Sequence, residues 1–150
     1  MSLVARLRAL DADQRRALRA APLWLIRARL LHARLPAPGI LRRLRAPAPP
    51  ARAGAAPPPP PAAMRRALAA WSRRFPWRSD CMIQALAARL WLERAGIAPQ
   101  VRLGARRGVD GALLAHIWLT VDGEVVTGGA LEGRDLAEFA PPRDGSRPDG

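Results

Sequence analysis

Cys81 is the residue of this chain best suited to covalent chemistry. The sequence holds one Cys and two His. Ser79 and Asp80 come directly before it, and both residue types cap helices, so we expect Cys81 in the first turn of a helix. There the backbone N–H groups and the helix dipole stabilise a thiolate, which is the reactive form of cysteine. The competing interpretation is a buried and inert cysteine.

His116 is the candidate base for this thiol. It lies in a predicted strand, 113–121, whose alternation places it beside Trp118 on the face opposite the predicted core. The other histidine, His32, lies among Leu and Arg residues and is predicted to be structural. A Cys that opens a helix, followed by a His on a strand, is how papain-like and transglutaminase-like enzymes form a thiolate–imidazolium pair.

Other chemistries have less support in the sequence. One Cys and two His do not make a convincing zinc site. The glycines of 104–111 lack the spacing and the Lys-Ser or Lys-Thr of a phosphate-binding loop. We therefore expect this chain to bind no metal and no cofactor. Gln84 lies one turn after Cys81, but the backbone N–H of Cys81 is the favoured oxyanion donor. Trp77 and Trp118 flank the candidate site in the sequence. For both residues, packing in the core is an alternative to contact with the substrate.

The elements that position the two side chains follow from caps, prolines and alternation. A helix over 62–75 is ended by Pro76, and a second helix runs from Cys81 to about residue 95, where Gly96 stops it. Asp122-Gly123 predicts a tight turn between two strands. The predicted strands are 101–104, 113–121 and 124–127, with a loop at 106–111 and a break at Gly128-Gly129. The fold class is α+β, in which a helix packs against a small antiparallel sheet.

Helices are also predicted before this domain, within residues 1–45. Pro22 suits a first helical turn, Pro36 ends the helix, and a short helix around 40–44 follows. We favour packing of this region on the main domain over a membrane-surface or docking helix, because Arg side chains reach water easily from a half-buried helix. The predicted apolar face consists of Leu23, Ile26 and Leu30, widened by Trp24, Leu31 and Leu35.

Composition divides the chain into four parts. The Arg- and Leu-rich helical region 1–45 is followed by 46–61, whose Pro, Ala and Gly content predicts a linker with polyproline II character. Residues 62–141 form the domain that holds Cys81 and His116. Residues 142–150 are rich in Pro, Gly, Asp and Arg and are predicted to be a disordered tail.

The charge is unevenly distributed. All 25 basic residues are Arg, and the net charge of +13 combines +14 up to Asp80 with −1 from Cys81 onward. A basic N-terminal half favours acidic partners, which include nucleic acid, anionic lipid and acidic peptides. No helix-turn-helix or other reading motif is evident, so we expect no nucleic-acid partner.

The expected location is the cytoplasm. A single Cys excludes an intrachain disulfide, and no secretory signal pattern opens the sequence. The most apolar N-terminal stretch, 23–35, is short and carries three Arg residues, so we expect neither a membrane span nor membrane contact.

Four sequence runs carry a family resemblance. They are Phe75-Pro-Trp-Arg-Ser-Asp-Cys-Met-Ile-Gln-Ala-Leu-Ala, Glu93-Arg-Ala-Gly-Ile, Val101-Arg-Leu-Gly-Ala and Ala115-His-Ile-Trp-Leu-Thr-Val-Asp-Gly-Glu-Val-Val. In this order and spacing, the chain resembles the lasso peptide biosynthesis leader peptidases, in the stand-alone form without a leader-recognition domain. The resemblance covers roughly residues 65 to 141. It implies a transglutaminase-like (papain-like) cysteine peptidase domain at 62–141.

The resemblance also implies roles and partners. Cys81 would attack the carbonyl at the junction of leader and core in a ribosomally made precursor, and His116 would activate the thiol and protonate the leaving amine. The implied partners are the precursor peptide, a separate small leader-recognition protein and a lasso cyclase that uses ATP.

One position departs from the family pattern. Some members carry an Asp twelve residues after the catalytic His, where this chain has Gly128. Thr127, a backbone carbonyl or an acid within 132–138 are the alternatives for the group that orients His116, and the sequence does not select among them. The acids are Glu132, Asp135 and Glu138. Asp122 is predicted to shape the hairpin instead.

Two other functions compete with leader removal. The same Cys–His pair would serve an amidase or acyltransferase acting on another substrate. Alternatively, the missing Asp would be consistent with a non-catalytic, transglutaminase-like binding module.

Overall fold

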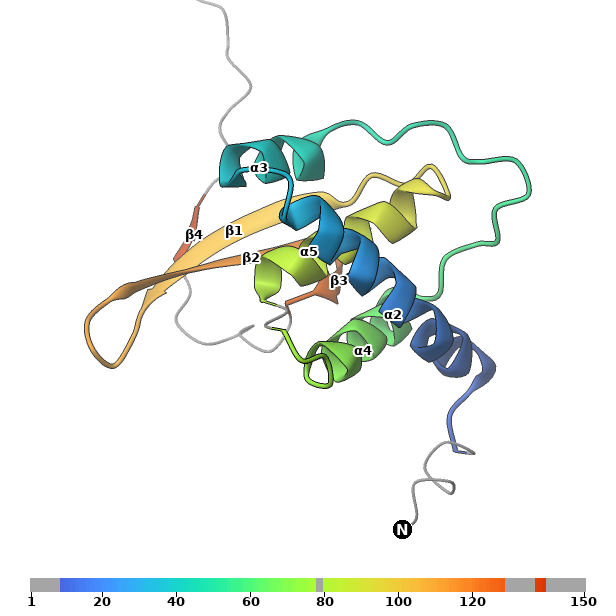
Figure 1. Cartoon of the computed structure of the whole chain (residues 1–150), viewed down its shortest axis with the longest axis horizontal. Helices are drawn as coiled ribbons and strands as arrows, with labels where there is room; N and C mark the ends of the chain where they lie inside the picture. Colours follow the sequence, from blue (N-terminus) through green and yellow to red (C-terminus); the bar gives the residue numbers. More distant parts are fainter. Residues whose placement is uncertain (1–8, 78–79, 129–136, 140–150) are drawn as a thin grey trace, which may run out of the picture.

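The computed structural model describes residues 9–77, 80–128 and 137–139. Within these ranges the helices come first and the strands follow, so the predicted α+β class is confirmed (Figure 1). The helices are α2 (Ala12–His32), α3 (Ala37–Arg45), α4 (Pro61–Ser72) and α5 (Cys81–Glu93). The strands are β1 (Gln100–Arg107), β2 (Leu113–Val121), β3 (Glu124–Thr127) and β4 (Ala137–Phe139).

The strands form one antiparallel sheet in the order β3-β2-β1-β4. β1 is longer than predicted, and the predicted loop at 106–111 was wrong for its first two residues. Arg106 and Arg107 pair with Leu114 and Leu113 of β2. The hydrogen bonds that extend β1 come from β2. The amino-acid composition of 106–107 does not indicate this pairing, so the sequence did not predict it. The hairpin of β1 and β2 therefore projects well beyond the helices (Figure 1).

β4 was not predicted. Its three residues pair with Leu103, Gly104 and Ala105 of β1, at the edge of the sheet (Figure 1). A three-residue strand carries too little alternation to be recognised from sequence, and its pairing with β1 spans more than thirty positions of the chain.

The helix α5 lies at the centre of the core, where it contacts α2, α3, α4, β2 and β3 (Figure 1). Its consecutive residues Ala85–Ala88 are fully buried. Small side chains on both faces let the helix approach its neighbours closely. On β2, Ile117 and Leu119 are buried in the same core and Val121 packs against it, whereas Ala115, predicted on the same face, is exposed.

The helix α2 begins earlier than predicted, and Pro22 lies inside it rather than in its first turn. A capping box starts the helix: the Asp11 side chain accepts from the backbone N–H of Gln14, and the Gln14 side chain accepts from the backbone N–H of Asp11. This reciprocal cap offers the first turn a strong start ten residues before the proline.

Pro22 leaves one helical carbonyl without its usual donor. A proline has no N–H, so the carbonyl four residues before it, that of Leu18, lacks an intrahelical partner. The indole N–H of Trp71 on α4 donates to this oxygen at 2.8 Å. Trp71 therefore compensates for the proline and joins α2 to α4.

We expect Trp71→Phe to lower the free energy of unfolding by about 1–2 kcal/mol, because the ring is kept while the Leu18 carbonyl loses its donor. In a Pro22→Ala background the new backbone N–H can bond to Leu18, so the same change should cost about 1 kcal/mol less. Urea denaturation of the four proteins of this double-mutant cycle measures both losses. Equal losses in the two backgrounds would contradict the compensation.

The face that α2 buries agrees only in part with the predicted one. Trp24 is buried, and Leu31 and Leu35 pack against the core, as predicted. The other predicted residues are exposed: 49% of Leu23, 40% of Ile26 and 53% of Leu30 are accessible to solvent. Their places in the core are taken by fully buried residues of α2, which are Ala17, Ala21, Leu25 and Ala28. Two helices can approach more closely through alanines than through leucines. A prediction based on the positions of large apolar side chains does not identify such an alanine face as the buried one.

The predicted packing of the N-terminal helices on the main domain is confirmed. Residues of α2 and α3 share one hydrophobic core with α4, α5 and the sheet. Among the described helices, none combines the length and the apolar composition that crossing a bilayer requires.

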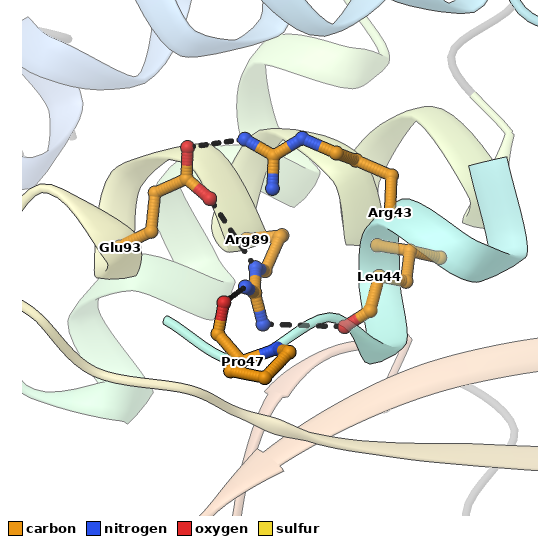
Figure 2. Close-up of polar contacts among 5 residues, drawn as sticks. All are labelled: Arg43, Leu44, Pro47, Arg89 and Glu93. Carbon is orange, nitrogen blue, oxygen red and sulfur yellow. Dashed lines mark hydrogen bonds and ion pairs between the residues drawn. The ribbon is translucent and has the colours of Figure 1, made fainter. Parts of the chain in front are cut away.

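A buried arginine ties α3 and the linker to α5. Arg89 is fully buried, and its guanidinium donates to the carbonyls of Leu44 at 3.3 Å and Pro47 at 3.0 Å, and to the carboxylate of Glu93 at 3.4 Å (Figure 2). Arg43 donates to the other oxygen of that carboxylate (Figure 2). The hydrogen bond that Arg43 donates to Glu93 raises the pKa of Arg43, although partial burial acts in the opposite direction. Three of the five Arg89 donors are thus satisfied without water.

The linker runs close to the end of α5. The backbone N–H of Arg52 donates to the carbonyl of Arg94 at 3.1 Å. Gly96 has φ of +74°, as its predicted role as a helix stop requires, and a Cβ there would lie 2.9 Å from the backbone nitrogen of Ala51. Gly96 therefore ends the helix and also makes room for the linker.

Candidate functional site

Cys81 is the first residue of α5, as predicted. The Asp80 side chain caps the helix by accepting from the backbone N–H of Ile83 at 3.1 Å. Ser79, the other predicted cap, lies outside the described residues. The thiol is free and half-buried at the margin of the core. The predicted placement at a helix N-terminus is confirmed, and a fully buried cysteine is not what the structure contains.

His116 lies on β2, on the face opposite Ile117 and Leu119, and is half-buried. Its neighbour on the same face, Trp118, stacks beside it with ring centroids 5.8 Å apart and 21° between the planes. Across the sheet His116 pairs with Gly104 of β1, and a Cβ on that glycine would lie 3.1 Å from the Trp118 ring. The glycine thus makes room for Trp118, which packs over β1 and supports one side of the imidazole.

The group that orients His116 is a backbone carbonyl. Nε2 of the ring lies 2.9 Å from the carbonyl oxygen of Gly128, at the end of β3. A carbonyl oxygen only accepts, so Nε2 carries the proton in the neutral ring and Nδ1 presents a lone pair. The lone pair on Nδ1 is what a base needs to take a proton from a thiol.

A side chain at position 128 does not fit this arrangement. Gly128 has φ of +80°, and a Cβ there would lie 2.8 Å from Cβ of Trp118 and 2.9 Å from Nε2 of His116. Position 128, where the sequence resemblance leads us to expect Asp, therefore needs glycine here, and its main chain provides the acceptor.

The other candidates for the third group have different places. The Thr127 hydroxyl accepts from the backbone N–H of Leu119 at 3.2 Å, beside the irregular pairing of β2 and β3. Asp122 has φ of +50° in the β2–β3 turn, as its predicted role in the hairpin requires. Glu132 and Asp135 lie outside the described residues, and the side chain of Glu138 is also outside them. The sequence signalled the glycine, but only the fold aims its carbonyl at the imidazole.

The two candidate side chains come from neighbouring elements but not from one face of the sheet. The core that contains α5 includes Ile117 and Leu119 of β2, and His116 lies on the other face of that strand. α5 contacts both β2 and β3, and its first residue is Cys81 (Figure 1). In the described part of the chain, the hydrogen bond of the His116 ring goes to Gly128, and none joins it to the sulfur of Cys81.

The residues that flank Cys81 are partly explained by packing. Trp77 stacks on Phe75 with centroids 4.4 Å apart, and Phe75 in turn packs beside Trp71. The indole N–H of Trp77 is buried and meets no acceptor among the described residues. Gln84 is half-buried one turn after Cys81. Within the described ranges, no group of three or more His, Cys, Asp or Glu side chains is arranged to hold a metal ion.

Comparison with protein families finds a match to the model described as transglutaminase-like superfamily over residues 22–141. This range includes Cys81, His116 and Gly128, and also the second half of α2 and the linker. Comparisons with curated proteins and with solved structures find no match.

Proposed function

Since the chain belongs to the transglutaminase-like superfamily, we propose that it is a cysteine peptidase in which Cys81 is the nucleophile and His116 the base. The observation that carries this proposal is the hydrogen bond between Nε2 of His116 and the Gly128 carbonyl. It fixes the tautomer that leaves Nδ1 free to accept a proton. The placement of the thiol at the first residue of α5 supports the other half of the pair.

The proposed reaction forms and then hydrolyses a thioester. The sulfur of Cys81 attacks the scissile carbonyl carbon while its proton moves to Nδ1 of His116. The tetrahedral intermediate collapses, the C–N bond breaks, and the imidazolium gives the proton to the leaving amine. Water then attacks the thioester, His116 takes a proton from it, and the thiol is regenerated. Nε2–H remains bonded to the Gly128 carbonyl throughout.

The N-terminus of α5 is the proposed oxyanion site. The first backbone N–H groups of a helix have no intrahelical acceptor, and that of Cys81 is among them. An N–H on the nucleophile itself lies close to the carbonyl oxygen that becomes negative in the tetrahedral intermediate.

We infer from the sequence resemblance that the substrate is a ribosomally made lasso peptide precursor, cut between leader and core. The support is the order and spacing of the four sequence runs between Phe75 and Val126. The proposed partners are the precursor, a separate leader-recognition protein and a lasso cyclase that uses ATP, and the proposed location is the cytoplasm. This chain itself needs no cofactor for thiol chemistry.

The test is to incubate the purified chain with the precursor encoded beside its gene and the matching leader-recognition protein, and to follow the products by mass spectrometry. We expect two fragments whose summed mass exceeds the mass of the precursor by one water. A chain that binds the precursor complex and releases nothing would contradict the peptidase proposal. A leader joined to an added amine in place of water would indicate an acyltransferase.

Gly128 offers a second test of this mechanism. We expect Gly128→Ala to reduce leader release by about 10- to 100-fold, since its Cβ would displace the imidazole and small misplacements of a catalytic group have effects of this size. Gly128→Asp should not restore a family-like triad, because it introduces the same Cβ.

A matched control separates the collision from backbone strain. Gly123→Ala places an alanine at φ of +81° where no atom lies within 4 Å, so it carries the strain of about 1–2 kcal/mol without touching His116. Unchanged turnover in Gly128→Ala, or equal losses in both variants, would contradict the role of this carbonyl.

A further inference from the structure

A groove opens at the end of α5 opposite to Cys81. It has a volume of about 330 Å³ and lies between α2, the linker and the C-terminal end of α5. Trp24, Leu31 and Leu90 provide its apolar surface, while charged side chains complete the lining. The charged residues are Arg27, Arg52, Glu93 and Arg94.

The groove carries an uncompensated positive charge. Within residues 9–77, 80–128 and 137–139, no ion pair involves Arg27, Arg52 or Arg94. The single acid in the lining, Glu93, is already paired with Arg43 and Arg89 (Figure 2). Its carboxylate is therefore neutralised from the side of the core and does not offset the three arginines of the groove.

The arginines come from three separate segments and surround an aromatic surface. The Arg27 guanidinium lies 5.0 Å from the centre of the Trp24 ring, and Trp24 stacks on Trp91 beneath it. Arg52 and Arg94 are brought together by the hydrogen bond between their main chains. Guanidinium groups at several points around an apolar floor suit carboxylates that alternate with apolar side chains.

We propose that this groove binds an acidic segment of the peptide substrate, at a distance from the scissile bond. This inference rests on the proposed function, because it takes the substrate to be a peptide. The volume suits a few side chains of one extended chain, whereas a folded partner protein would need a face of about 800 Å². Charge complementarity selects the acidic composition.

The length of α5 sets the spacing of such a substrate. The helix has 13 residues from Cys81 to Glu93, so its two ends are about 20 Å apart. An extended peptide covers this distance with about six residues. We therefore expect the acidic segment to lie at least about six residues from the bond that Cys81 attacks.

Binding is measured by fluorescence anisotropy with the full chain carrying Cys81→Ala, so that no cleavage intervenes. The probe is a fluorescein-labelled ten-residue peptide of alternating Glu and Leu, compared with its Gln and Leu counterpart. We expect the acidic probe to bind at least about tenfold more tightly, and Arg27→Gln with Arg94→Gln to remove about tenfold of its affinity.

The matched control removes two charges elsewhere. Arg66 and Arg73 are exposed on and after α4, and Arg66→Gln with Arg73→Gln should change the affinity by less than about twofold. Melting temperatures identify any loss of fold, and Arg94→Gln alone, which leaves the Arg27–Trp24 contact in place, should still weaken binding.

Three results would overturn the proposal: equal affinity for the two probes, equal losses in the groove and control variants, or equal displacement of the probe by a ten-nucleotide oligothymidylate. Equal affinity for the two probes would mean that the groove does not select acidic peptides. Equal losses in the groove and control variants would mean that binding follows the net charge of the protein. Equal displacement by the oligonucleotide would mean that the groove binds anions in general. The binding measurement uses the Cys81→Ala variant, so these results do not bear on the peptidase proposal. A failure of cleavage, in turn, does not contradict the binding of an acidic peptide in the groove.

Discussion

Replacement of Cys81 by alanine should reduce leader release by at least about 1000-fold, because alanine has no thiol with which to form the thioester intermediate. His116→Ala should have an effect of the same order, because the thiol loses its proton acceptor and the leaving amine its proton donor. The two residues act as one unit, so the double variant should be little slower than either single variant.

The measurement is the rate of appearance of the free leader, followed by mass spectrometry under single-turnover conditions. Two matched controls are available in the chain. His32→Ala removes the other histidine, which lies at the end of α2, and should leave the rate unchanged. Cys81→Ser keeps the size of the side chain and should be nearly as slow as the alanine variant, because a hydroxyl at this place has no comparable anion form.

Each outcome decides a different part of the proposal. Equal rates for the parent and both alanine variants would mean that the activity comes from another protease in the preparation. Loss of activity in Cys81→Ala with full activity in His116→Ala would contradict the base and transfer the search to another acceptor near the thiol. A loss in both, with His32→Ala unaffected, supports the pair.

Replacement of Arg89 by alanine should lower the free energy of unfolding by about 3–5 kcal/mol, the largest effect on stability that we expect from a single change. The guanidinium is fully buried and satisfies the carbonyls of Leu44 and Pro47 and one oxygen of Glu93. Its removal leaves the buried carbonyl of Leu44 and the partly buried carbonyl of Pro47 without this donor, and the Glu93 carboxylate keeps only Arg43.

Urea denaturation with purified variants measures this loss. Arg94→Ala is the matched control, because it removes an exposed arginine five residues further along, and should cost less than about 0.5 kcal/mol. Arg89→Lys should give an intermediate loss, since an ammonium on a flexible stem cannot reproduce the fork that reaches three acceptors. A cost for Arg89→Ala that equals the cost for Arg94→Ala would contradict the role assigned to this cluster.

The stability of the site should depend on the N-terminal helices. α2 and α3 contribute to the core that holds α5, and Arg89 fastens α3 and the linker to the same helix. The family match, which begins within α2, agrees with this continuity. The helix that presents Cys81 is therefore held on one side by the sheet and on the other by the chain that precedes the linker.

The sequence alone determined the elements whose signals are local. Asp80 and Gly96 begin and end α5, Asp122-Gly123 closes the β2–β3 hairpin, and strict alternation places His116 opposite Ile117 and Leu119. Caps, tight turns and alternation depend on neighbours within a few residues, so a sequence contains them in full. They were sufficient to select Cys81 and His116 as the candidate nucleophile and base.

The tertiary structure decided what depends on residues far apart in the chain. The buried face of α2, the pairing of β4 with β1, the donor from Trp71 to Leu18 and the enclosure of Arg89 all join distant segments. The acceptor for His116 belongs with them, because whether a carbonyl at position 128 points at the imidazole depends on how β3 returns along β2. A glycine in the sequence permits that approach, but only the packed sheet brings the two atoms to 2.9 Å.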